Sequence, residues 1–180
     1  WGPEAPGAGG RRGHPLQGSC APVRTFIERL NAPVASTIMG GGACPGNHRL
    51  FTGMIGMHGS HASNLASDQC DLLIAVGCRF SDRVALQPDT FASQAKIVHI
   101  DIDRSEIDKN VLTDHHIVGS AKRVLELLNE KLPQHDYPEW KAWVFSHPEV
   151  PLKKDDVLHP HEILETIQAV TGGDAIVATA

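Results

Sequence analysis

Two arginines and an aspartate follow a short apolar segment near the middle of the chain. Residues 72–76 (LLIAV) are apolar and end at Gly77, and Arg79, Asp82 and Arg83 come next. A run this short, apolar on both faces, is typical of a central strand in a parallel sheet. Ligands bind beyond the carboxyl ends of such strands, and paired guanidinium groups hold phosphate well. We therefore expect either a phosphate-binding crevice here or a surface loop with ordinary Arg–Asp pairs.

A second strand ends in acidic residues. Residues 96–102 (KIVHIDI) predict this strand, with Asp101 near its end and Asp103 directly after it. In dinucleotide-binding folds, a carboxylate at such a position binds the hydroxyl groups of a ribose. The alternative is that the two aspartates only cap the segment 105–110.

The segment 39–59 contains seven glycines and predicts a long, ordered loop without regular structure. Loops of this length inside a domain are usually functional. Residues 60–68 then predict a helix that begins at Ser60. The free N–H groups and the dipole at its amino end would favour an anion.

The remaining apolar spacing predicts an α/β fold. Val23, Phe26, Ile27 and Leu30 repeat at the spacing of a helix, and a further helix follows Ser120. Strands are expected at residues 34–38, 71–77, 96–102 and 115–119. Strands that alternate with helices predict one doubly wound, Rossmann-like parallel sheet flanked by helices, with an atypical first strand.

Composition changes along the chain predict four segments. Residues 1–19 are rich in glycine and proline and are expected to be irregular or disordered. Residues 20–132 form the predicted central nucleotide-binding domain. Residues 133–157 form a linker with one short docking helix. Residues 158–180 are the truncated start of another domain, with a helix at 161–170 and a strand from 174.

Composition also limits the function. The net charge of −5 over 180 residues argues against a nucleic-acid partner. There is no apolar window long enough for a membrane span and no signal peptide, so we expect a cytoplasmic protein without a membrane partner. The four cysteines form no CxxC pair and are expected to be free thiols.

Motifs for catalysis are missing. The sequence has no P-loop, HExxH or GxSxG motif and no metal-ligand cysteine spacing, so no catalytic residue and no metal ligand is assigned. His159 and His161 have the spacing of a metal pair, but the polar flank of a helix is a far commoner origin for it. The residues themselves thus indicate a nucleotide-binding domain.

Four stretches resemble the catalytic subunit of the acetolactate synthase (acetohydroxyacid synthase) family: residues 33–40 (PVASTIMG), 50–59 (LFTGMIGMHG), 71–84 and 96–103. The resemblance covers residues 21–132, the family's central domain, and is fainter from Leu158 onward. It implies a thiamine-diphosphate-dependent transferase that decarboxylates pyruvate and condenses it with a second 2-ketoacid, in branched-chain amino-acid biosynthesis. The alternatives are another thiamine-diphosphate carboligase or decarboxylase with the same central domain, and a non-catalytic nucleotide-binding module.

The resemblance implies FAD in this domain, where the family does not use it for net redox chemistry. It also implies thiamine diphosphate and Mg²⁺ in the parent enzyme, although the motif that binds them and the catalytic glutamate are absent from this chain. The family's opening strand is replaced by WGPEAPGAGG, and Ser81 occupies a position that is acidic in the family. We therefore expect the chain alone to be inactive and to be a monomer or weak dimer. The implied partners are the parent's remaining domains and a regulatory subunit.

Matching positions then give the residues that the resemblance implies for each site. The residues near the substrate channel are Met57, Asp82 and Arg83. The residues that contact FAD are Thr37, Ile38, Met39, Gly56, Met57, His58, Gly59, Gly77, Cys78, Arg79, Ser81, Arg83, Val84, Asp101 and Ile102.

Overall fold

The computed structural model of the chain describes residues 20–147 and 157–177. Residues 1–19, for which the sequence predicts irregular structure, lie outside the described residues. In chain order the elements are α1 (Cys20–Leu30), β1 (Val34–Ser36), η1 (Ile38–Gly40), β2 (Phe51–Met54), α2 (His61–Gln69), β3 (Leu72–Val76), β4 (Lys96–Asp101), η2 (Arg104–Glu106), β5 (His115–Val118), α3 (Ala121–Lys131), α4 (Pro138–Phe145) and α5 (Pro160–Thr171).

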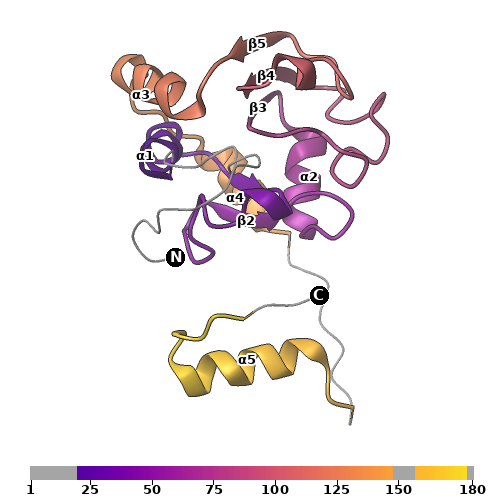
Figure 1. The fold of residues 1–180 in the computed structure, drawn as a ribbon, viewed down its shortest axis with the longest axis vertical. Coiled ribbons are helices and arrows are strands. Elements are labelled where there is room, and N and C mark those ends of the chain that lie inside the picture. The colour runs from indigo at the N-terminus through magenta and orange to yellow at the C-terminus, as the bar shows by residue number, and fades with distance from the viewer. Residues whose placement is uncertain (1–19, 148–156, 178–180) are drawn as a thin grey trace, which may run out of the picture. The chain divides into compact units, whose positions relative to one another are not determined.

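Strands β3, β4 and β5 form a parallel sheet in that order (Figure 1). The sheet is covered on both faces, which explains the continuous apolar runs of its first two strands. On one face Ile100 packs with Phe26 of α1 and Leu125 of α3. On the other face Ala75 and Ile97 pack with residues of the loops that follow β3 and β4. Parallel strands flanked by helices confirm the predicted α/β class.

A second sheet consists of β1 and β2, which are also parallel. The prediction that 34–38 lies in one sheet with the other strands is wrong, as is the prediction of no regular structure in 39–59. The strand β1 ends at Ser36 because Thr37 starts a 3₁₀ turn, where its hydroxyl accepts the N–H of Gly40 at 3.1 Å. Gly53 lies inside β2 with φ +113. Glycine is uncommon inside strands, so the sequence pattern does not predict a strand here.

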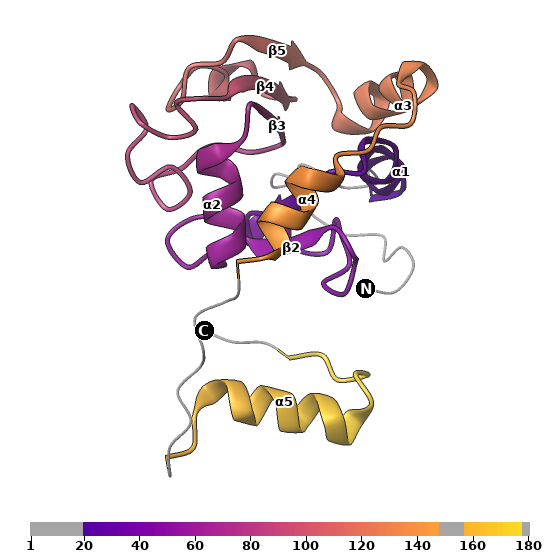
Figure 2. The ribbon, with the colours of Figure 1, turned by 180° about the vertical axis from the view of Figure 1, so that it is seen from behind.

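Helices α2 and α4 complete the first compact unit. Ser60 caps α2 as predicted, and its Oγ accepts the N–H of Ser63 at 3.2 Å. The helix α4 contacts α2 and buries Val144 (Figure 2). This is the short docking helix that the sequence predicts within 133–157.

The chain divides into two compact units, residues 1–149 and 150–180, and this boundary lies within the predicted linker. In the second unit α5 ends at Gly172, whose φ of +61 closes the helix. Residues 174–177 are in neither a helix nor a strand, although the sequence predicts a strand there. Among the described residues no helix is long and apolar enough to cross a membrane.

The packing of α3 on the sheet gives a stability prediction. Leu125 is completely buried against Phe26 and Ile100, so Leu125→Ala leaves a cavity and should lower the free energy of unfolding by about 2–5 kcal/mol. Leu127→Ala, on the exposed side of the same helix, should change it by less than about 0.5 kcal/mol. Urea unfolding monitored by circular dichroism measures both. Equal losses would contradict the packing described here.

Candidate functional site

The glycine-rich loop packs directly on the arginine-bearing loop. The N–H of Met57 donates to the carbonyl oxygen of Arg83 at 2.8 Å. The side chain of Asn64 in α2 holds both sides of Gly56, since its Oδ1 accepts the Gly56 N–H at 2.9 Å and its Nδ2 donates to the Gly56 carbonyl at 3.0 Å. Two loops that are separate in sequence are therefore joined into one surface.

Gly56 is required at this junction for two reasons. Its φ of +105 is a conformation that side chains rarely permit. A Cβ atom there would also lie 2.2 Å from the carbonyl oxygen of Arg83. No other residue type would allow the two backbones to come this close.

The arginine loop is anchored at its start and its middle. The N–H of Gly77 donates to the carbonyl of Ile100 at 2.8 Å, and Gly77 then turns the chain with φ +63. Phe80 has φ +47 and buries its ring, while Asn110 donates to the Arg79 carbonyl at 3.0 Å. With the backbone held in this way, the residues Arg79 and Arg83 are exposed.

The aspartate at the end of β4 is buried. Asp101 is 6% exposed, and its Oδ1 accepts the N–H of Asp103 at 2.8 Å. Asp103 in turn caps η2 by accepting the N–H of Ser105 at 2.9 Å, so the capping alternative holds for Asp103. The hydrogen bonds from Ser105 lower the pKa of the Asp103 carboxyl, and Lys109 and Arg79 add to this effect.

His99 is a residue that the sequence predictions missed. It is completely buried, its ring meets Phe80 edge to face at 5.1 Å, and its Nε2 lies 3.8 Å from Oδ2 of Asp101. Within the described residues neither ring nitrogen makes a hydrogen bond of standard geometry, although the Cys78 backbone lies close enough to raise the pKa of the ring. Burial lowers the pKa of the imidazole, and the Asp101 carboxylate opposes that shift. The sequence signal that could have indicated its burial is a polar residue at a strand position where the pattern predicts an apolar one.

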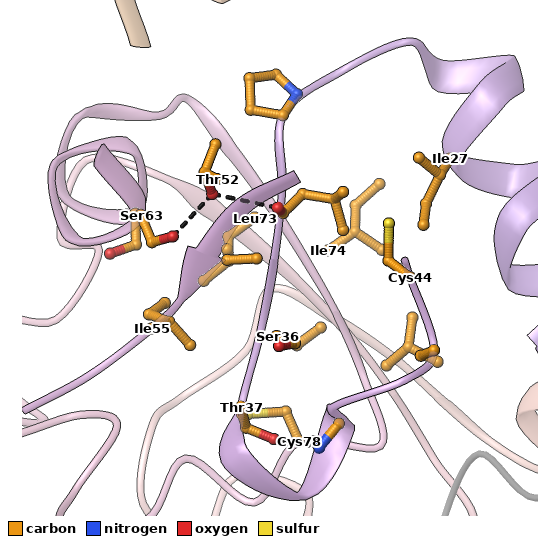
Figure 3. A pocket seen from close by; sticks show the side chains of 18 of the residues that line it. Ile27, Ser36, Thr37, Cys44, Thr52, Ile55, Ser63, Leu73, Ile74 and Cys78 are labelled. Carbon is orange, nitrogen blue, oxygen red and sulfur yellow. Dashed lines mark hydrogen bonds between the residues drawn. The ribbon is translucent and has the colours of Figure 1, made fainter. Parts of the chain in front are cut away.

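An apolar cavity of about 300 Å³ lies between the two sheets (Figure 3). Five of the predicted FAD residues line it: Thr37, Met39, Gly77, Cys78 and Val84. The other predicted residues lie outside its lining: Ile38, Gly56, Met57, His58, Gly59, Arg79, Ser81, Asp82, Arg83, Asp101 and Ile102. Burial raises the pKa of the Cys78 thiol, and all four cysteines are free. Among the described residues, no three or more side chains of the metal-binding types come together.

Comparison with known proteins decides the family. Residues 10–128 match the family described as the thiamine pyrophosphate enzyme central domain, which is more than half of the chain. The chain belongs to this family. The strands, the joined loops and the cavity between the two sheets all lie within or beside the matched residues of this central domain.

Several proteins similar to this chain are named as acetolactate synthases. The chain is 46% identical over 129 residues to the "Probable acetolactate synthase large subunit" of Methanocaldococcus jannaschii, covering 72% of this chain and 22% of that protein. It is 39% identical over 167 residues to the "Acetolactate synthase large subunit" of Lactococcus lactis, covering 90% and 29%. It is also 39% identical over 167 residues to "Acetolactate synthase 1, chloroplastic" of Nicotiana tabacum, covering 87% and 25%.

The chain thus spans between a fifth and a third of the length of these relatives. The predicted resemblance to acetolactate synthase is confirmed. One of the relatives is named as chloroplastic, so the cytoplasmic location of this chain stays a prediction.

The junction at Gly56 gives a prediction with a matched control. Gly42 also has a positive φ, +89, but a Cβ atom there would meet nothing within 4 Å. Gly42→Ala should therefore cost only about 1 kcal/mol of unfolding free energy, from backbone strain. Gly56→Ala should cost about 3 kcal/mol or more, because the two loops must also separate. Denaturant unfolding measures both, and similar losses would show that the loops are not tightly joined.

His99 makes stability depend on pH. Since folding lowers its pKa, the unfolded chain binds more protons at pH values below the ordinary pKa of about 6.5. The contribution of neutral His99 is present above that value and is lost as the pH falls through it. His99→Leu should therefore reduce the loss of stability between about pH 7.5 and about pH 5.5. His115→Gln, at an exposed position of β5, is the control for removing a histidine from the sheet, and a wild-type pH dependence in His99→Leu would contradict the assignment.

Proposed function

We propose that this central domain binds FAD at the carboxyl ends of β1, β3 and β4, as part of an acetolactate synthase large subunit. The observation that supports it most is the junction of the glycine-rich loop with the arginine loop, through the Met57 N–H and the Arg83 carbonyl. These are two of the stretches that carry the resemblance to the family. The names of the relatives favour this enzyme over other thiamine-diphosphate carboligases and decarboxylases.

The residues on this surface fit the diphosphate of FAD. A diphosphate needs cations, and Arg79 and Arg83 are both exposed on the same loop. Gly77 and Cys78, at the end of β3, and Thr37, beyond β1, line the same cavity. The apolar walls of this cavity beside Met39 and Val84 suit a flat ring system.

The carboxylate proposed to bind the ribose already has one of its two oxygens in a hydrogen bond. Asp101 is the predicted acceptor for its hydroxyl groups, but Oδ1 already accepts the N–H of Asp103. We assign the ribose contact to Oδ2, the second oxygen of the same carboxylate. The family does not use the flavin for net redox chemistry. We therefore assign to the residues of this chain only the binding and orientation of FAD.

The activity belongs to the longer parent protein. There, decarboxylation of pyruvate and condensation with a second 2-ketoacid would use thiamine diphosphate and Mg²⁺ held by other domains, and Met57, Asp82 and Arg83 would lie near the substrate channel. The implied partners are those domains and a regulatory subunit. The matched residues span about a quarter of the length of these relatives, so we assign the activity to an acetolactate synthase large subunit as a whole.

Titration with FAD tests the proposed site. The chain should quench flavin fluorescence with weak affinity, and Arg79→Ala should abolish the quenching. Loss of about 3 kcal/mol of contact lowers affinity more than a hundredfold. Arg123→Ala is the matched control, because it removes one exposed arginine from α3, away from the strand ends, and should leave quenching unchanged.

The outcomes distinguish a specific FAD site at Arg79 from a general effect of charge. If Arg79→Ala binds FAD as the unmodified chain does, the crevice lies elsewhere and the list of FAD residues is wrong. If Arg123→Ala weakens binding equally, the effect is one of total charge. If the unmodified chain leaves the fluorescence unchanged at millimolar protein, the proposal of FAD binding by this chain fails.

A further inference from the structure

We propose that the buried imidazole of His99 controls FAD binding by releasing or holding the Asp101 oxygen that accepts the ribose, a role that rests on the FAD site proposed above. Neutral His99 leaves Oδ2 of Asp101 available to a ribose hydroxyl group. Protonated His99 binds the same oxygen and withdraws it from the ribose. The affinity for FAD should therefore fall when His99 takes up a proton.

The two side chains lie on the same face of β4. They are two residues apart in one strand, and side chains at that spacing point to the same side of a sheet. His99 is completely buried and Asp101 nearly so, and Nε2 of His99 lies 3.8 Å from Oδ2 of Asp101. Because both groups are buried, the charge of one acts on the other with little screening by solvent.

The two carboxylate oxygens of Asp101 have different surroundings. Oδ1 accepts the N–H of Asp103 at 2.8 Å. Oδ2 lies beside the imidazole of His99, at a distance too long for a hydrogen bond. His99 thus adjoins the oxygen to which we assign the ribose, and in the neutral state it leaves that oxygen able to accept a hydroxyl group.

Protonation changes what the imidazole offers to Oδ2. A neutral ring has one N–H donor and one acceptor, whereas an imidazolium carries an N–H group on both nitrogens. In the imidazolium Nε2 is therefore always a donor, and its attraction to the carboxylate favours a charge-assisted hydrogen bond. The two atoms need to approach by only about 1 Å to reach the length of such a bond. Oδ2 then has a partner inside the protein and is a weaker acceptor for the ribose.

Groups from several elements face His99 and determine where it titrates. Burial has the largest effect and lowers the pKa of the imidazole. The groups that oppose this shift are the Asp101 carboxylate, the backbone of Cys78 after β3, Asp108, and Glu106 of η2. On β5, His116 pairs with His99 in register. Because burial prevails, His99 is neutral at pH 7 and takes up its proton below the ordinary pKa of about 6.5.

FAD and the proton therefore compete for this part of the site. Each must weaken the binding of the other by the same factor. The ribose contribution to FAD affinity is present above the pKa of His99 and is lost as the pH falls through it. Bound FAD should in turn lower the pKa of His99. The expected size is that of one hydrogen bond, about fivefold in affinity.

Quenching of flavin fluorescence at two pH values tests the coupling. For the unmodified chain the dissociation constant of FAD should rise about fivefold between about pH 7.5 and about pH 5. In His99→Leu, whose side chain takes up no proton, the two values should differ by less than about twofold. The control His116→Gln removes an exposed histidine from the neighbouring strand and should keep the rise, because solvent screens an exposed charge. Circular dichroism at each pH shows whether the chains are folded.

An NMR titration of the His99 ring tests the pair without FAD. The ring signal of His99 is the one that is missing from the spectrum of His99→Leu. Asp101→Asn removes the carboxylate that raises the pKa of His99, so the pKa should be lower in this variant than in the unmodified chain. Addition of FAD to the unmodified chain should also lower the pKa of His99.

Each outcome bears on either the coupling or the FAD site. A rise of the dissociation constant that is lost in His99→Leu, together with a lower His99 pKa in Asp101→Asn, supports the coupling. If both chains show the same pH dependence, or if Asp101→Asn leaves the pKa of His99 unchanged, the coupling is wrong and the FAD site stands. If the unmodified chain quenches no flavin fluorescence at either pH, the FAD site is wrong and the role of His99 fails with it.

Discussion

The arrangement of the candidate site depends on one close backbone contact, between Gly56 and the carbonyl of Arg83. The contact leaves no room for a side chain, and Asn64 fixes the same glycine from the other side. Through it, a loop that follows β2 is fixed to a loop that follows β3, so the relative position of the two sheets is set at their carboxyl ends. The direction in which the arginine loop presents its side chains depends on the same contact.

The core explains why this junction is firm. The β3–β4–β5 sheet is packed on both faces, against α1 and α3 on one side and against its own following loops on the other. Phe80 belongs to the second of these layers and is a residue of the arginine loop itself. The loop therefore presents exposed cations on a backbone that is anchored in the core, which would limit the entropy lost on binding the diphosphate of the proposed FAD site.

The sequence was informative where a residue's role is local. The apolar runs of β3 and β4, the cap at Ser60 and the glycine end of α5 all follow from short-range preferences, and the structure contains each of them. The sequence failed where tertiary pairing decided the outcome. Phe51–Met54 contains a glycine at positive φ and becomes a strand only because β1 lies beside it. The inward position of Asp101 and the burial of His99 likewise depend on neighbours distant in sequence, such as Phe80.

Among the described residues β1 pairs only with β2 and β3 only with β4, and residues of both strands line the cavity between the two sheets. Exposed edges are the usual starting points for edge-to-edge aggregation, and natural sheets protect them with charges, prolines or covering helices. Here residues of α1, α2 and α3 line the same cavity as β1 and β3 and stand beside those strands. Heating that loosens the loop junction would expose both strands together, and neither strand contains a charged residue or a proline that discourages pairing. Thermal denaturation of this chain should then be irreversible, and its aggregates should contain intermolecular β-structure built from β1 and β3.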